Sequence, residues 1–297
     1  MKRPRKQRPL IRWHGGKWMI APWVIEHLPP HHLYVEPFGG GASVLLRKPR
    51  AKAEIYNDLD ETLYRLFCTL RDPAQSAALI ERLEMTPYSR AEFEAAYEPT
   101  DDPVERARRT IVRSYMGYGT DGTMGIYPTG FRATVTSNLK LPAQEWATYP
   151  RALRRIVDRL KGVVIEQCDA LELIARMDGP DVLFYVDPPY IPETRSSGNR
   201  RRGKGFHVYA HELETEDHVR LLELLRSVRG MVVLSGYPSE LYDIHLPDWR
   251  RVERPAYADG GRPRTEVLWI NPAARARIAP APRSLFHKGD DHHVHHA

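Results

Sequence analysis

The stretch LFYVDPPY, residues 183–190, joins four apolar residues to an acid, two prolines and a tyrosine. Its apolar half is typical of a buried strand, and Asp187 follows where that strand ends. Proline fixes φ and has no N–H, so Pro188 and Pro189 keep the backbone rigid and extended, with carbonyl groups left as acceptors. We therefore predict that the Asp187 carboxylate and the Pro188 carbonyl accept both hydrogens of an exocyclic amino group, while Tyr190 stacks on its planar base. A proline-rich strand exit with a surface tyrosine is the alternative.

Working outward from this stretch, predicted strands alternate with predicted helices. The segments 31–38, 53–58, 162–169 and 230–237 have the composition of strands, and helical patterns occupy 150–161, 170–177 and 212–228. Two late strands are predicted near 250–257 and 264–270. This alternation predicts an α/β fold with a mostly parallel, doubly wound sheet. Such sheets bind ligands at the carboxyl ends of their strands, which is where Asp187 lies.

A glycine-rich turn follows the first predicted strand. In YVEPFGGGAS, residues 34–43, the strand runs into Gly39, Gly40 and Gly41 and then into the predicted start of a helix, so the backbone can approach a ligand closely. The spacing matches neither GxGxxG nor GxxxxGK[ST], which disfavours dinucleotides and nucleoside triphosphates. Asp58 lies seventeen residues beyond Gly41, where an acid can bind ribose hydroxyls. These features favour a nucleoside-containing cofactor, and a turn with a helix-capping Asp58 and no ligand is the alternative.

The composition limits the class of protein. The 297 residues include 44 Lys and Arg against 38 Asp and Glu, with a pI near 9.3, which suggests a polyanionic partner. Cys68 and Cys168 stand far apart, so neither a disulfide framework nor a zinc site is predicted, and no metal site is expected. No apolar run approaches the ~20 residues of a membrane-spanning helix, and the basic start lacks the apolar region of a signal peptide. We expect a cytoplasmic protein with no membrane contact.

Changes in composition along the chain predict its domains. Residues 1–9 are a basic arm, 10–70 and 150–271 form the catalytic domain, 71–149 form an inserted subdomain, and 272–297 are a flexible tail. The insertion is helical and charged at first and rich in Gly, Tyr, Thr and Asn from 113 onward. The basic segment 191–206 after DPPY is predicted to be a mobile loop.

Four motifs in order carry a resemblance to a known family. RWHGGK (12–17), YVEPFGGGAS (34–43), IYNDLD (55–60) and DPPY (187–190) resemble the Dam-like (D12 class, α-group) DNA adenine-N6 methyltransferases. The resemblance covers roughly residues 10–271 and is weakest from 72 to 150. It implies a Rossmann-like, S-adenosyl-L-methionine-dependent methyltransferase sheet with an inserted, mainly helical target-recognition subdomain. The implied activity is site-specific methylation of adenine N6 in double-stranded DNA after base flipping.

The resemblance also implies roles for individual residues. The catalytic residues would be Asp187, Pro188, Pro189 and Tyr190. The residues that bind S-adenosyl-L-methionine would be Trp13, Lys17, Phe38, Gly39, Asp58, Asp169 and Asp187. Lys17 would lie near the methionine end, Asp58 at the ribose and Asp169 near the adenine amine. His14 stands where many relatives have alanine, whereas the following GGK is retained.

Basic, aromatic and amide residues of the insertion and of the loop after DPPY are candidate DNA contacts. They are Arg113, Tyr118, Arg132, Asn138, Arg200, Arg201 and Arg202. For the arginine run the alternative is a solvated loop. We expect a monomer that binds duplex DNA.

Other functions remain open from the sequence. Cytosine-N4 methyltransferases and RNA or protein amine methyltransferases share the logic of presenting a planar amino group beside (D/N/S)PPY. A DNA-binding relative that has lost catalysis is a further alternative, although it would have no need of the intact DPPY, GGK and Asp58.

Overall fold

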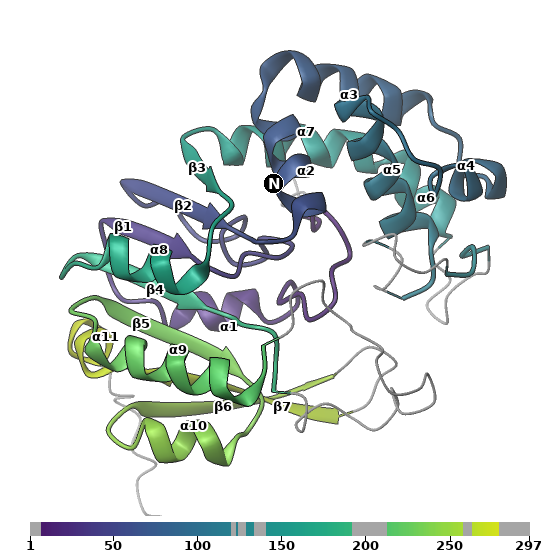
Figure 1. Ribbon diagram of the computed structural model, residues 1–297. Helices are drawn as coiled ribbons and strands as arrows, with labels where there is room; N and C mark the ends of the chain where they lie inside the picture. The colour runs from purple at the N-terminus through teal and green to yellow at the C-terminus, as the bar shows by residue number, and fades with distance from the viewer. Residues whose placement is uncertain are drawn as a thin grey trace, which may run out of the picture.

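Seven strands form one sheet in the order β3-β2-β1-β4-β5-β7-β6 (Figure 1). The structure is a computed structural model that describes residues 7–119, 123, 129–133, 141–191, 213–257 and 263–278. The strands are β1 (Leu33–Glu36), β2 (Ala53–Asn57), β3 (Val163–Glu166), β4 (Val182–Val186), β5 (Met231–Gly236), β6 (Arg250–Tyr257) and β7 (Pro263–Ile270). The predicted α/β fold class, with its Rossmann-like sheet, is confirmed.

The strand order places a ligand site. β1, β2, β3, β4 and β5 are parallel, and among the described strands β7, which lies between β5 and β6, is antiparallel to both of these neighbours. The chain builds outward on one side through β2 and β3 and on the other through β4 and β5, so the direction changes between β1 and β4. Ligands bind at such a switch point, outside the carboxyl ends of the strands. The glycine turn after β1 and Asp187 after β4 both lie there.

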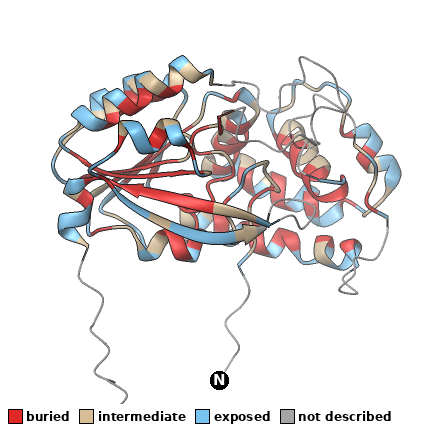
Figure 2. Ribbon diagram, turned by 90° about the horizontal axis from the view of Figure 1, so that it is seen from below, coloured by how far each residue is buried: buried red, intermediate tan, exposed pale blue. Residues whose placement is uncertain are grey.

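Alternate side chains of β4 are buried against opposite faces of the sheet. Leu183 and Tyr185 join one hydrophobic cluster, while Phe184 and Val186 join the other, as the period of two in a strand requires. All five residues of β4 are buried, because helices cover both faces (Figure 2). The second cluster is closed by α8 (Ala170–Met177), α9 (Thr215–Ser227) and α10 (Glu240–His245).

The first cluster extends from the sheet into a layer of helices. This layer contains α2 (Glu61–Arg71), α3 (Pro73–Met85), α4 (Arg90–Ala95), α5 (Pro103–Met116), α6 (Pro142–Ala147) and α7 (Tyr149–Leu160) (Figure 1). Aspartate side chains cap the N-termini of α2, α3 and α5, as the acid-proline starts of α3 and α5 favour. α2 and α7 flank the predicted insertion 71–149, yet they also pack against α3, and α2 packs against α5. The helical layer therefore extends beyond the predicted insertion, residues 71–149, because it also includes α2 and α7.

A buried ion network fastens this layer to the sheet. Glu54 of β2 is 3% exposed and accepts hydrogen bonds from Lys48 at 2.7 Å and from Arg159 of α7 at 2.6 and 2.9 Å. Burial raises the pKa of Glu54, but the hydrogen bonds from Arg159 and Lys48 outweigh it and leave that pKa lowered. Removing one partner of such an ion pair strongly destabilises a fold, because the other charge stays buried without compensation.

Two expectations about helices were wrong. The helix predicted to start after the glycine turn is a short turn over 43–47, stopped where Pro49 cannot continue a helix. The flexible tail was predicted from 272, but Pro272–Arg277 form α11, which Asn271 caps and which packs against β5. Helix α1 (Ala21–Glu26) lies between the RWHGGK segment and β1. In the described part of the chain, no helix combines the length and the apolar character needed to cross a bilayer.

Candidate active site

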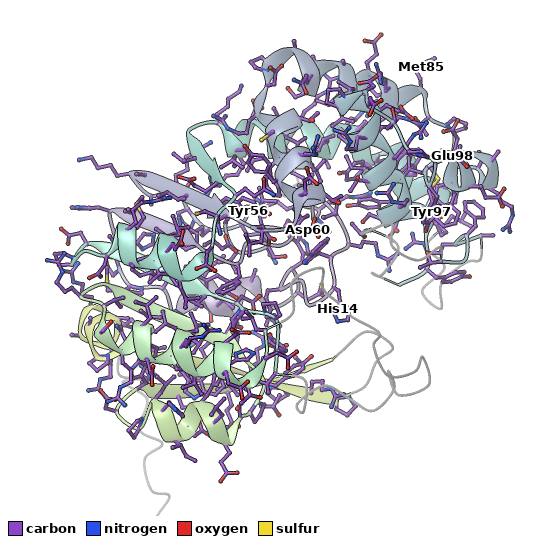
Figure 3. The ribbon with its side chains drawn as sticks, viewed as in Figure 1. His14, Tyr56, Asp60, Met85, Tyr97 and Glu98 are labelled. Atoms are coloured by element: carbon purple, nitrogen blue, oxygen red, sulfur yellow. The ribbon has the colours of Figure 1, made fainter. Side chains whose placement is uncertain are left out.

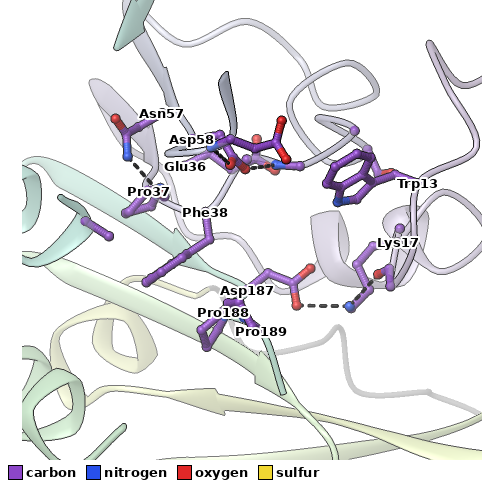
Figure 4. A pocket seen from close by; sticks show the side chains of 18 of the residues that line it. Trp13, Lys17, Glu36, Pro37, Phe38, Asn57, Asp58, Asp187, Pro188 and Pro189 are labelled. Atoms are coloured by element: carbon purple, nitrogen blue, oxygen red, sulfur yellow. Dashed lines mark hydrogen bonds and ion pairs between the residues drawn. The ribbon is translucent and has the colours of Figure 1, made fainter. Parts of the chain in front are cut away.

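One pocket collects the four sequence motifs. It encloses about 880 Å³, including its open mouth, and lies at the carboxyl ends of β1, β2 and β4 (Figure 4). Its wall comes from residues 13–17, 36–41, 43–44, 57–60, 185 and 187–190, with Ala170 and Leu213. Motifs that lie up to 177 positions apart, from Trp13 to Tyr190, thus form one chemical surface.

The glycine turn is built for close packing. A Cβ on Gly39 would lie 2.1 Å from the ring of Tyr56, and Gly40 has a φ of +49° with the indole of Trp13 directly above it. The Gly39 N–H donates to the Asn57 carbonyl oxygen at 2.8 Å. The rings of Tyr56 and Trp13 leave no room for a side chain at Gly39 or Gly40, so only glycine fits there. Trp13 and the backbone of the turn line the same part of the pocket.

Asp58 binds the backbone of the turn. Its Oδ2 accepts from the Gly40 N–H at 2.7 Å and its Oδ1 from the Asp60 N–H at 2.9 Å. The carboxylate lines the pocket and each oxygen has a second lone pair, so it can also accept from a ligand hydroxyl. Asp58 therefore shapes the turn and faces the space beside it.

Asn57 is a structural residue that sequence reasoning missed. Its amide nitrogen donates to the carbonyl oxygens of Pro37 at 2.9 Å and Cys168 at 3.0 Å, and its oxygen accepts from the Cys168 N–H at 2.9 Å. One side chain thus joins the ends of β1, β2 and β3. A buried amide at the end of an apolar strand was the available signal, since buried polar groups require partners.

Asp187 is paired with Lys17. The Lys17 Nζ lies 2.9 Å from Asp187 Oδ1 and donates to the Gly15 carbonyl oxygen at 2.8 Å (Figure 4). Burial raises the pKa of Asp187, while the charge and the hydrogen bond of Lys17 lower it. Because the lysine is itself 5% exposed, the pair is shielded from water. Lys17 therefore favours the ionised, accepting form of the carboxylate.

Tyr190 is held from three sides. Its hydroxyl donates to Glu266 Oε2 at 3.0 Å, its ring meets Tyr237 edge to face at 4.4 Å, and the Lys17 ammonium lies 4.5 Å from its ring centre. The tyrosine is 9% exposed. Glu266 and its bond to Tyr190 were not predicted, because the two residues are 76 positions apart.

A second acid lies at the bottom of the pocket. Glu36, the last residue of β1, is 2% exposed. Burial, followed by the negative charge of Asp187, raises its pKa to about 8. At neutral pH Glu36 is therefore mainly protonated, and the two acids do not both carry charge.

The remaining predicted site residues divide into two groups. Phe38, predicted to bind the cofactor, and Pro188 and Pro189, predicted to be catalytic, line the pocket. Asp169 does not; it is exposed and caps α8, accepting from the N–H groups of Leu171 and Glu172 at 2.9 and 3.1 Å. Its neighbour Ala170 lines the pocket instead, so contact between Asp169 and a cofactor stays a prediction.

Two of the predicted DNA-binding arginines are engaged inside the helical layer. Arg113 donates to the Ala96 carbonyl oxygen at 2.5 Å, and its guanidinium lies over the ring of Tyr97, well away from the strand ends where Tyr56 and Asp60 lie (Figure 3). Arg132 is 9% exposed and forms an ion pair with Glu145 at 2.9 Å. This geometry favours structural roles for both arginines, and their contact with DNA stays a prediction.

Tyr118 is the predicted DNA-binding residue that the structure places on the surface. It is 47% exposed, and its N–H donates to the Gly130 carbonyl oxygen at 2.9 Å. Asn138, Arg200, Arg201 and Arg202 lie outside the described residues. Over the described ranges, no group of three His, Cys, Asp or Glu side chains is arranged to hold a metal ion.

Comparison with known proteins follows the same motifs. Residues 13–244 match the family model described as D12 class N6 adenine-specific DNA methyltransferase. "DNA adenine methylase" of Salmonella typhi is 24% identical over 270 residues, which cover 86% of this chain and 92% of that protein. "Type II methyltransferase M.MjaIII" of Methanocaldococcus jannaschii is 25% identical over 74% of this chain and 80% of its own. "DNA N-6-adenine-methyltransferase" of Escherichia phage P1 is 23% identical over 80% of this chain and 31% of its own.

Proposed function

Because this chain belongs to the D12 class of N6 adenine-specific DNA methyltransferases, we propose that its pocket at the switch point between β1 and β4 is the methyl-transfer site. The protein is an adenine-specific DNA methyltransferase, and the family match favours adenine N6 over cytosine N4. The observation that carries the site is the meeting of the glycine turn and Asp187-Pro188 in one pocket.

The residues of the pocket fit S-adenosyl-L-methionine. Lys17 is the cation suited to a carboxylate, and Asp58 faces the pocket with lone pairs for ribose hydroxyls. The glycine turn, Trp13 and Phe38 offer an apolar wall. When bound, this cofactor supplies a methyl group on a positively charged sulfur, and the Asp187 carboxylate, which lines the pocket, suits a cation nearby.

Asp187 and Pro188 are assigned to the target amino group. Adenine N6 is a weak nucleophile, since its lone pair is delocalised into the ring. A carboxylate oxygen and a carbonyl oxygen that accept its two hydrogens draw the nitrogen toward tetrahedral geometry. The prolines contribute rigidity, because fixed acceptors need no reorganisation during the reaction. Orientation of the reacting atoms supplies much of the remaining acceleration, roughly 7–11 kcal/mol in well-aligned systems.

The substrate is assigned as adenine in double-stranded DNA, turned out of the helix. A base inside a duplex cannot reach a pocket at the end of a sheet, so it must be extruded at a cost of a few kcal/mol. Tyr190 is the stacking residue of this proposal. In the described conformation the Lys17 ammonium lies over its ring, so a base must take that position as it enters.

The test is a variant that removes one acceptor. Asp187→Ala should lower methyl transfer roughly a hundredfold or more, the usual cost of losing one preorganised electrostatic contact. Calorimetry should show that it still binds S-adenosylhomocysteine. Asp248→Ala, at an exposed position, is the matched control and should keep full activity.

The product decides the substrate. Duplex DNA treated with the protein and labelled cofactor should yield N6-methyladenine after digestion to nucleosides. Label in N4-methylcytosine, or full activity of Asp187→Ala, would contradict the assignment.

A further inference from the structure

The hydroxyl of Tyr190 interacts with two carboxyl groups, the buried Glu266 and the half-buried Asp187. It is 3.0 Å from Glu266 Oε2, and it is also close enough to Asp187 to lower the pKa of that acid by hydrogen bonding. A phenol has one proton to donate, so a hydrogen bond to one carboxylate leaves the other without it. The direction of that single proton determines how many lone pairs Asp187 keeps for a substrate.

Glu266 is placed to accept the hydrogen bond from this phenol. It lies on β7 at the pocket end of the sheet, opposite Arg254 of β6, and is 8% exposed. Among the described residues, its side chain has no ion-pair partner within 4 Å, and Tyr190 provides its hydrogen bond. Asp187 in contrast has Lys17 at 2.9 Å. The charge of Lys17 also lowers the pKa of Glu266, but Lys17 forms its ion pair with Asp187, so the phenol matters more to Glu266. A hydrogen bond from a phenol to an ionised acceptor is about twice as strong as one to a neutral acceptor.

The ring of Tyr190 is fixed as well. Tyr237 packs edge to face against it at 4.4 Å, and Arg264 lies 5.8 Å from the ring centre of Tyr237. With the ring held, rotation of the hydroxyl is the remaining freedom, and Glu266 sets it. A buried acid at this position is otherwise unfavourable, since burial raises the pKa of Glu266.

We propose that Glu266 is a positioning residue for methyl transfer: it holds the Tyr190 hydroxyl proton away from Asp187, which leaves that carboxylate free to accept from the target amino group. This inference rests on the proposed function of Asp187. Without Glu266 the phenol donates to Asp187 and competes with the substrate. Glu266 thus acts through Tyr190 and touches neither cofactor nor base.

The experiment is a double-mutant cycle on kcat with duplex DNA. Glu266→Leu should lower kcat roughly ten- to hundredfold, the usual worth of a hydrogen bond to a charged group. The KM for the cofactor should stay within about twofold. Glu266→Gln keeps an accepting oxygen and should recover most of the activity. In the Tyr190→Phe background, where no hydroxyl competes, Glu266→Leu should cost less than about twofold.

The controls separate this inference from the proposed function. Glu253→Gln, on the exposed neighbouring strand, should behave as the unmodified protein. Thermal unfolding of each variant distinguishes lost folding from lost chemistry, and Glu266→Gln supports the test if the leucine variant is unstable. An equal loss from Glu266→Leu in both backgrounds, or no loss in either, would overturn the positioning role. Absence of adenine methylation by the unmodified protein would instead refute the proposed function.

Discussion

Replacing Glu36 with glutamine tests what the folded protein loses by keeping an acid in its core. Glu36 is 2% exposed, and burial together with the charge of Asp187 raises its pKa from 4.5 to about 8. At about 1.36 kcal/mol per pKa unit, this difference corresponds to about 5 kcal/mol. Glutamine has nearly the same shape and no proton to lose, so Glu36→Gln should remove this contribution.

The sign follows from proton binding. Between pH 4.5 and 8 the folded protein keeps the Glu36 proton while the unfolded chain has lost it. Stability therefore falls as the pH rises through this window and levels off above the folded pKa. Relative to the unmodified protein, Glu36→Gln should gain up to about 5 kcal/mol between pH 4.5 and pH 8.5. Because the negative charge of Asp187 contributes to the raised pKa of Glu36, Asp187→Asn should lower that pKa and narrow the pH range over which stability falls.

The assay is urea unfolding at pH 5, 7 and 8.5, with the free energy of unfolding taken from linear extrapolation. Glu253→Gln, which removes an exposed carboxylate, is the matched control and should follow the unmodified protein at each pH. If the difference in unfolding free energy between Glu36→Gln and the unmodified protein is the same at all three pH values, Glu36 is not protonated in the fold and the reasoning fails.

Three further predictions concern the rest of the molecule. Glu54→Leu should destabilise the fold by about 3–5 kcal/mol, since it leaves two buried cations unpaired; a smaller loss in urea unfolding would show that they relax to water. Gly39→Ala should abolish binding of S-adenosylhomocysteine in calorimetry, because its Cβ would lie 2.1 Å from Tyr56; unchanged binding would mean that the turn yields. Tyr118→Ala should weaken DNA binding by about 1–3 kcal/mol in fluorescence titration if its ring stacks on a base, with stability changed by less than about 0.5 kcal/mol.

The strands and the pocket were accessible from the sequence because their signals are local. An apolar run followed by Asp187, and a strand followed by three glycines, each predict an element and its end. Parallel strands bring their carboxyl ends to one edge, so positions far apart in the chain could be assigned to one site. The structure places the glycine turn, Asp58 and Asp187 on one pocket for this reason, whereas Trp13 and Lys17 precede α1 and were assigned to the site through the family resemblance.

The missed features depend on contacts between distant segments. Glu266 lies 76 positions from Tyr190, and nothing near either residue in the sequence indicates the partner. Asn57 joins three strand ends through backbone groups whose positions only the folded sheet defines. The arginines of the insertion were predicted to contact DNA because of their charge. Arg113 instead donates a hydrogen bond to the Ala96 carbonyl oxygen inside the helical layer. Residue type predicted chemistry, and packing decided where it could be used.

The continuity of one hydrophobic cluster from the sheet into the helical layer bears on how new specificities can arise. Leu183 of the central strand and Leu79, Ile111 and Trp146 of the helices belong to the same core. A chimaera that exchanged the whole helical segment between relatives would have to repack this shared core. Substitution of exposed side chains such as Tyr118 therefore disturbs this core less than transplanting the helices as a module.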